Sequence, residues 1–100
     1  MFLYAKAVIP IMKKNNWGQF INLSSMAGKM AYSEEIAYCS TKAAVLGLTQ
    51  ALAVEFWNRG ITANVICPGP IQTKMLRNTY QYLAVINGQS INIDGGLVFY

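Results

Sequence analysis

Tyr38 and Lys42 are the two residues of this chain whose types and spacing could do chemistry together. In a helix, residues four apart lie on the same face, one turn from each other. An ammonium group beside a phenol favours the phenolate, and a tyrosine so placed could exchange a proton with an alcohol or a carbonyl group. Ser25, in the preceding loop, could hold the same substrate oxygen. We therefore predict the site of a carbonyl reductase or an alcohol dehydrogenase.

A helix over about residues 36–58 would position this pair, with Ser33 as its cap and Gly60 as its stop. One face carries Tyr38, Lys42, Val45, Thr49, Leu52 and Phe56, and another carries Ala43, Leu46, Val54 and Trp57. A helix that is apolar on two sides is covered on two sides. We therefore expect one face to pack on a sheet and the other on a second subunit, in a homodimer or a homotetramer.

Strands and helices alternate in the rest of the chain. We predict a helix over residues 2–14, which Pro10 should bend or end early. Buried strands are predicted at 19–24, 61–67 and 90–94. Residues 71–83 could form a short helix or an irregular segment. Buried strands on either side of a long helix favour an α/β fold with a parallel sheet.

The composition excludes several kinds of site. The 100 residues carry a net charge of +4, but the basic residues are scattered, so we expect no nucleic-acid surface. The chain has no histidine, which excludes imidazole metal sites and Ser/His triads. Cys39 and Cys67 lack metal-type spacing, and we interpret them as free thiols of a cytoplasmic protein. No apolar run approaches ~18 residues, so we predict no membrane-spanning helix.

Four motifs together resemble the short-chain dehydrogenase/reductase family. They are N-L-S-S-M-A-G at 22–28, A-Y-C-S-T-K at 37–42, G-I-T-A-N-V-I-C-P-G-P-I-Q-T at 60–73 and N-G-Q-S-I-N-I-D-G-G at 87–96. The Y-x-x-x-K pair alone arises by chance in many helices, whereas its combination with the other motifs is a specific signal. The resemblance implies a three-layer Rossmann-like parallel sheet. Residues 1–100 would be the C-terminal part of a single domain, the second half of a doubly wound fold.

The resemblance also implies an enzyme that uses NAD or NADP to interconvert an alcohol and a carbonyl compound, such as a 3-oxoacyl, sugar or small-ketone substrate. Ser25 would hydrogen-bond the substrate oxygen, Tyr38 would be the general acid/base, and Lys42 would bind the nicotinamide ribose. Tyr38 would thereby also lie against the cofactor. The remaining cofactor contacts would come from Pro68, Gly69, Ile71 and Thr73.

The chain departs from the family pattern at two places. The glycine-rich turn that holds the pyrophosphate has no counterpart, and the segment between Thr73 and Asn87 is shorter than the usual substrate-covering loop. An alternative interpretation is a truncated, non-catalytic remnant that acts as an oligomerising or partner-binding module. Among the residues themselves, Ser24 competes with Ser25 for the substrate oxygen, although the spacing to Tyr38 favours Ser25.

Overall fold

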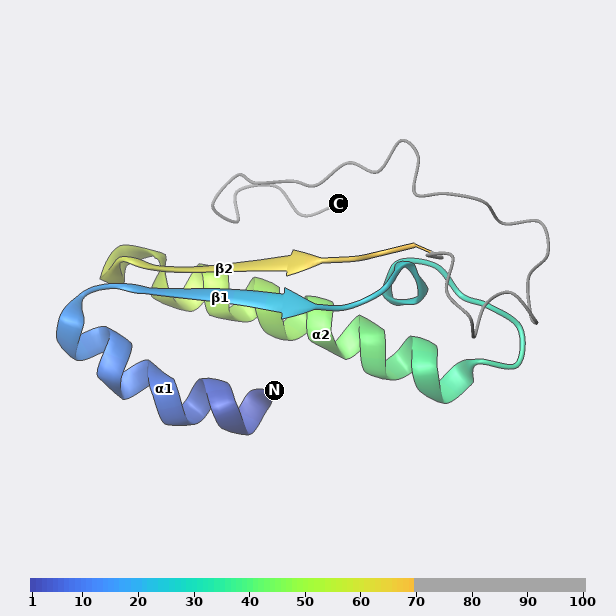
Figure 1. The fold of residues 1–100 in the computed structure, drawn as a ribbon, viewed down its shortest axis with the longest axis horizontal. Coiled ribbons are helices and arrows are strands. Elements are labelled where there is room, and N and C mark those ends of the chain that lie inside the picture. Colours follow the sequence, from blue (N-terminus) through green and yellow to red (C-terminus); the bar gives the residue numbers. More distant parts are fainter. Residues whose placement is uncertain (70–100) are drawn as a thin grey trace, which may run out of the picture.

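A computed structural model of the chain describes residues 1–69 (Figure 1). Its elements are α1 (Phe2–Asn15), β1 (Gly18–Leu23), the 3-10 turn η1 (Met26–Gly28), α2 (Ile36–Phe56), the 3-10 turn η2 (Trp57–Arg59) and β2 (Ile61–Ile66). The two helices and two strands predicted for this part of the chain are all present. The predicted strand at 90–94 and the segment 71–83 lie outside the described residues.

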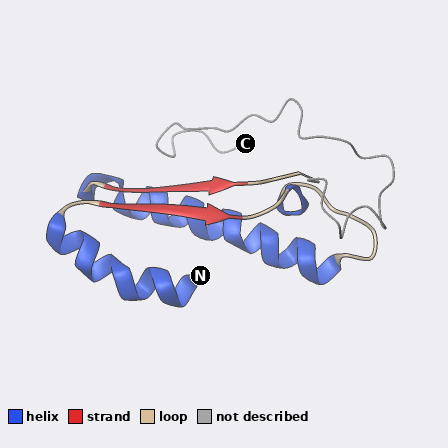
Figure 2. Cartoon of the chain, in the orientation of Figure 1, coloured by secondary structure: helices blue, strands red, loops and turns tan. Residues whose placement is uncertain are grey.

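Strands β1 and β2 form a parallel pair, with Gly18 opposite Ile61 and Leu23 opposite Ile66. Helix α2 connects them and runs in the opposite direction to both strands (Figures 1 and 2). Parallel strands need such a crossover, because a tight turn can join only antiparallel neighbours. The predicted fold class, a partial Rossmann-like α/β fold with a parallel sheet, is therefore confirmed.

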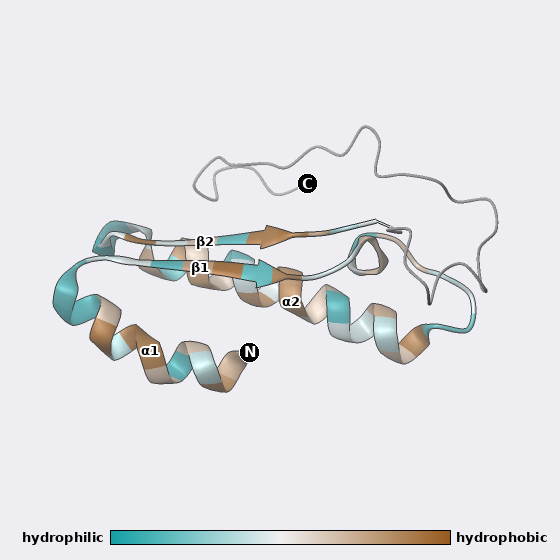
Figure 3. Cartoon of the chain, in the orientation of Figure 1, coloured by the Kyte–Doolittle hydropathy of each residue, from teal (hydrophilic) through white to brown (hydrophobic). Residues whose placement is uncertain are grey.

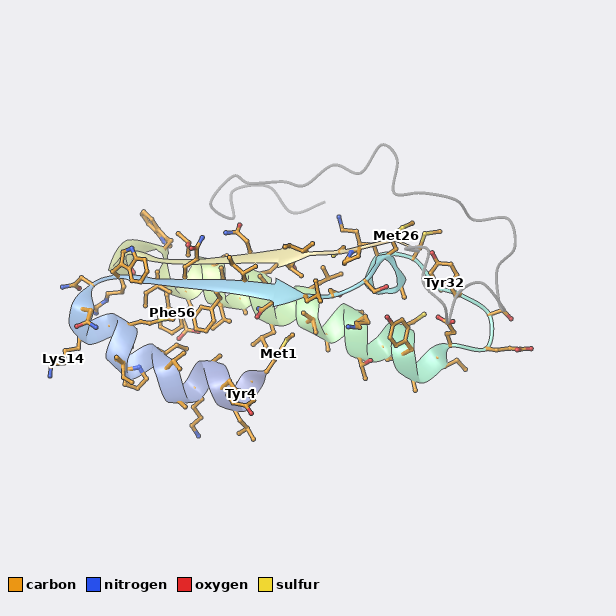
Figure 4. All side chains as sticks on the ribbon, in the orientation of Figure 1. Met1, Tyr4, Lys14, Met26, Tyr32 and Phe56 are labelled. Carbon is orange, nitrogen blue, oxygen red and sulfur yellow. The ribbon has the colours of Figure 1, made fainter. Side chains whose placement is uncertain are left out.

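Both helices pack on the same face of the sheet. The core combines residues of α1, α2 and β2: Ala5, Leu52, Ala53, Phe56, Ile61 and Ala63. Phe56 lies between α1 and the strands (Figure 4), where the ammonium of Lys13 stands 5.2 Å from its ring centroid. The sheet is thereby anchored to two helices that are far apart in the sequence.

In the described part of the chain the opposite face of β1 is exposed, which corrects the prediction of a buried strand. Ile21 is 64% exposed and Leu23 is 56% exposed. Along β1 these exposed residues alternate with buried and half-buried ones. Figure 3 shows the hydropathy of each residue along the strand. The physical reason is that the helices of the described part cover only one face of the sheet.

A buried polar connection fixes α2 on β1. The side-chain amide of Asn22 donates to Thr49 Oγ1 over 2.8 Å, and the Thr49 hydroxyl donates to the backbone oxygen of Val45 over 2.7 Å. Thr49 is only 3% exposed. Because a buried polar group without a partner is costly, this pairing favours one placement of the helix along the strand.

Two predictions about helix ends differ from the structure. Pro10 does not end α1 early, since the helix continues for five further residues to Asn15, and a bend at Pro10 stays a prediction. Ser33 does not cap α2; the helix begins after Glu35, which makes no side-chain capping bond. The reason is the backbone of Glu34, whose φ of 65° is left-handed and prevents a helix from starting earlier.

Gly60 ends the α2–η2 segment as predicted. Its φ of 68° lies in the left-handed region that glycine adopts readily. Its carbonyl oxygen accepts a bond of 3.2 Å from the backbone N–H of Gly18, so this turn also starts the pairing of the two strands. Among the described helices, none is long and apolar enough to cross a membrane.

Candidate active site

The carboxyl ends of the two strands bring the loops of the predicted site together. Beyond the strands, the backbone N–H of Ser24 donates to the oxygen of Ile66 over 2.8 Å, and the N–H of Met26 donates to the oxygen of Pro68 over 3.0 Å. Met26, labelled in Figure 4, marks this end of the molecule. In open α/β sheets, ligands bind outside the carboxyl ends of the strands.

Ser25 begins the turn η1 in an extended backbone conformation, with φ −160° and ψ 163°. Its Oγ accepts a hydrogen bond of 3.2 Å from the backbone N–H of Ala27. Because the oxygen is the acceptor in this bond, the hydroxyl hydrogen stays able to donate to a substrate oxygen. Ser25 is half-buried, so its side chain is held but not sealed from solvent.

Tyr38 and Lys42 lie one turn apart near the start of α2, and the structure brings their side chains together. The Lys42 ammonium stands over the Tyr38 ring, 5.6 Å from the ring centroid, within cation–π range. Tyr38 is 47% exposed, and Lys42 is half-buried. A phenol accessible to solvent and held beside a positive charge can reach a bound ligand and exchange a proton with it.

The backbone of α2 is bonded directly to the loop that carries Ser25. Ser24 Oγ donates to the backbone oxygen of Lys42 over 2.7 Å. Gly28 lies against the same point, since a Cβ there would be 2.8 Å from that oxygen. The 3-10 turn η1 thus packs on the segment of α2 that carries Tyr38 and Lys42.

Sequence reasoning missed the roles of Ser24 and Gly28. It treated Ser24 only as a competitor of Ser25. The available signal was that consecutive residues of extended backbone point to opposite sides. One serine of the pair therefore faces the helix layer and the other faces away.

The remaining predicted site residues are placed only in part. Pro68 and Gly69 follow β2, are half-buried and lie beside η1 through the Met26–Pro68 bond. Ile71 and Thr73 lie outside the described residues. In the described part of the chain, no three His, Cys, Asp or Glu residues gather as a metal site would require. Cys39 and Cys67 are both free thiols there.

The sequence matches the family model described as short chain dehydrogenase over residues 1–83. A 3-oxoacyl-[acyl-carrier-protein] reductase of Synechocystis sp. is 33% identical over 129 residues, which cover 100% of this chain and 52% of that protein. The chain thus spans about half the length of this relative.

Solved structures resemble the fold over about three quarters of the chain. ElxO with NADP bound superposes with a TM-score of 0.69 and 39% identity, covering 77% of this chain and 31% of ElxO. Levodione reductase gives a TM-score of 0.71 with 36% identity, covering 78% of this chain and 30% of the reductase. The described part of the chain therefore has the architecture found in these proteins.

Proposed function

The chain belongs to the short-chain dehydrogenase family, and we propose that it functions as an NAD(P)-dependent oxidoreductase. The enzyme would interconvert an alcohol and a ketone or aldehyde. The observation that carries the proposal is the ammonium of Lys42 over the ring of Tyr38, on a helix bonded to the Ser25 loop. These contacts support an arrangement in which a proton donor, a cation and a substrate-binding hydroxyl would lie on connected backbone. Residues 1–100 would form the C-terminal part of one Rossmann-like domain.

The three side chains would divide the chemistry between them. In the direction of reduction, the Ser25 hydroxyl donates a hydrogen bond to the carbonyl oxygen of the substrate and Tyr38 delivers the proton to that oxygen. In the direction of oxidation, the Tyr38 phenolate takes the proton from the alcohol. The Lys42 ammonium would lie over the Tyr38 ring during this exchange.

The residues at the strand ends fit a dinucleotide. The backbone turn after β2 lies beside η1, at the edge of the sheet where parallel α/β folds bind nucleotides. Lys42 would bind the ribose, and Pro68 and Gly69 would contact the nicotinamide, together with Ile71 and Thr73 outside the described residues. The bound cofactor would supply or accept the hydride at the substrate carbon. ElxO, bound to NADP, supports a cofactor of this class.

A carbonyl compound of the 3-oxoacyl, sugar or small-ketone type is the substrate class that we propose. The Synechocystis relative is named a 3-oxoacyl-[acyl-carrier-protein] reductase and the similar solved structure a levodione reductase, and both names support a reaction of this class. We also propose a cytoplasmic location, which the two free thiols support.

The outer face of α2 would join subunits in a homodimer or a homotetramer. Val54 is 61% exposed and Trp57 is 72% exposed, although both are large and apolar. Exposed apolar surface of this kind is typical of subunit contacts. The same observation favours the second candidate, a non-catalytic module that oligomerises or binds a partner. Tight binding of NADPH by the purified protein, measured by nicotinamide fluorescence, would rule out that candidate.

Tyr38→Phe tests the proposed chemistry. Removing the phenol hydroxyl should lower turnover of acetoacetyl-coenzyme A with NADPH by about 10²–10⁴-fold, the usual contribution of a general acid. NADPH affinity should stay close to that of the wild type, since the ring and Lys42 remain. Turnover near the wild-type rate would refute the assignment of Tyr38.

A further inference from the structure

Ser24 is bonded both to the sheet and to the helix of the proposed site. Its backbone N–H donates to the backbone oxygen of Ile66, the last residue of β2, and its Oγ donates to the backbone oxygen of Lys42 over 2.7 Å. The side chain is 4% exposed, so water does not compete for this bond. One residue therefore connects the edge of the sheet to the backbone of Lys42.

Within residues 1–69, the first half of α2 has few other attachments. The buried residues of this helix are Thr49, Leu52, Ala53 and Phe56, all in its second half. In the first half, Ile36 is 83% exposed and Tyr38 is 47% exposed. Core packing thus fixes the C-terminal end of α2, whereas the segment with Tyr38 and Lys42 depends on its contact with η1.

The contact between η1 and α2 is close at Gly28. A Cβ on Gly28 would lie 2.8 Å from the Lys42 backbone oxygen and 2.9 Å from Ser24 Oγ. Loop and helix therefore meet without a side chain of Gly28 between them. At this separation, a hydrogen bond from Ser24 can set the distance between the two backbones.

We infer that Ser24 is a positioning residue for the reaction. Its hydroxyl holds the Lys42 backbone, and with it Tyr38 one turn earlier, at a fixed place relative to Ser25. The inference rests on the proposed function. Ser24 and Ser25 would thus have different roles. Ser24 acts through Lys42 and does not touch the substrate, whereas Ser25 would bind the substrate oxygen.

Thr49 offers a matched control for Ser24. Both hydroxyls donate to a backbone oxygen of α2 over 2.7 Å, and both residues are almost fully buried. They differ in place, since Thr49 bonds to Val45 and Asn22 and has no bond to the Ser25 loop. Ser24→Ala and Thr49→Val should both lower the urea midpoint, because each removes a buried hydrogen bond.

Kinetics should separate the two variants. We expect Ser24→Ala to lower kcat for acetoacetyl-coenzyme A about tenfold at an unchanged KM for NADPH, since small displacements of reacting groups are costly. Thr49→Val should keep kcat within about twofold of the wild type when rates are corrected for the folded fraction. Ser24→Cys, which keeps the size of the side chain and a weak donor, should have an intermediate kcat and replaces Ser24→Ala if that variant does not fold.

Hydrogen exchange gives a readout that does not depend on turnover. The amides of residues 38–46 should exchange faster in Ser24→Ala than in the wild type. Their exchange rates should be unchanged in Thr49→Val. If the wild type is active and Ser24→Ala leaves kcat unchanged, the inference is overturned and the proposed function stands. The same holds if Thr49→Val lowers kcat as much as Ser24→Ala does. A wild type that neither binds NADPH nor turns over the substrate would overturn the proposed function, whatever the exchange data.

Discussion

Adding one methyl group at Gly28 should separate the site loop from its helix. In Gly28→Ala the new Cβ would lie 2.8 Å from the backbone oxygen of Lys42 and 2.9 Å from its carbonyl carbon. Ordinary contacts of this kind begin near 3.4 Å. The Cβ would also lie 2.9 Å from Ser24 Oγ. Since the two Lys42 atoms belong to the helix backbone, α2 and η1 must move apart by roughly 0.6 Å.

This displacement should cost both stability and turnover. Overpacking of this size typically destabilises a protein by about 1–3 kcal/mol. A displacement approaching 1 Å at a reacting group can cost up to about a hundredfold in rate, and we expect kcat to fall about ten- to a hundredfold. That fall corresponds to about 1.4–2.8 kcal/mol of lost transition-state stabilisation.

Gly47→Ala is the control for this experiment. Gly47 lies in the middle of α2, and a Cβ there would meet nothing within 4 Å. Replacing a helical glycine by alanine should stabilise the protein by about 0.5–1 kcal/mol without a change in kcat. Urea unfolding and initial rates of NADPH oxidation measure both quantities. A Gly28→Ala variant with kcat within about twofold of the wild type would refute the steric reasoning.

Three further predictions concern the cation, a turn and the outer helix face. Lys42→Ala should lower kcat at least about tenfold and also weaken NADPH binding; unchanged affinity in a fluorescence titration would remove Lys42 from the ribose. Gly60→Ala should lower the free energy of unfolding by roughly 2–4 kcal/mol, because φ is 68° and the Cβ would collide with the Asn16 backbone oxygen; an unchanged urea midpoint would contradict this. Val54→Glu should shift sedimentation towards the monomer, because a carboxylate would be buried in the proposed interface; an unchanged sedimentation coefficient would exclude Val54 from it.

The helix that carries Tyr38 and Lys42 could be predicted from sequence because its signals are local. Its length, its apolar spacing and the stop at Gly60 follow from the residues themselves, and α2 ends within two residues of the expected position. The predicted start is also confirmed, since α2 begins at Ile36, but the predicted cap at Ser33 is wrong. The left-handed φ of Glu34 comes from the path of the loop and not from the propensity of Ser33 to cap a helix.

The exposed face of β1 could not be read from residue types either. Ile21 and Leu23 predict burial, and an apolar run does not reveal which face a helix layer covers. That information is contained in the pairing of strands and in the side on which each crossover helix lies. Both depend on contacts between residues that are far apart in the chain.

The placement of the site follows from a polar pattern on β1 that extends past its end. Asn22 and Ser24 are two residues apart, so both side chains point to the helix layer, where they bond to Thr49 and to the Lys42 backbone. Because α2 runs in the opposite direction to the strand, the later strand residue meets the earlier helix residue. The Asn22–Thr49 bond therefore holds the second half of α2, and the Ser24–Lys42 bond holds the first half, which carries Tyr38 and Lys42. Ser25, one residue further, points to the other side of the extended backbone, where we propose that its hydroxyl binds the substrate.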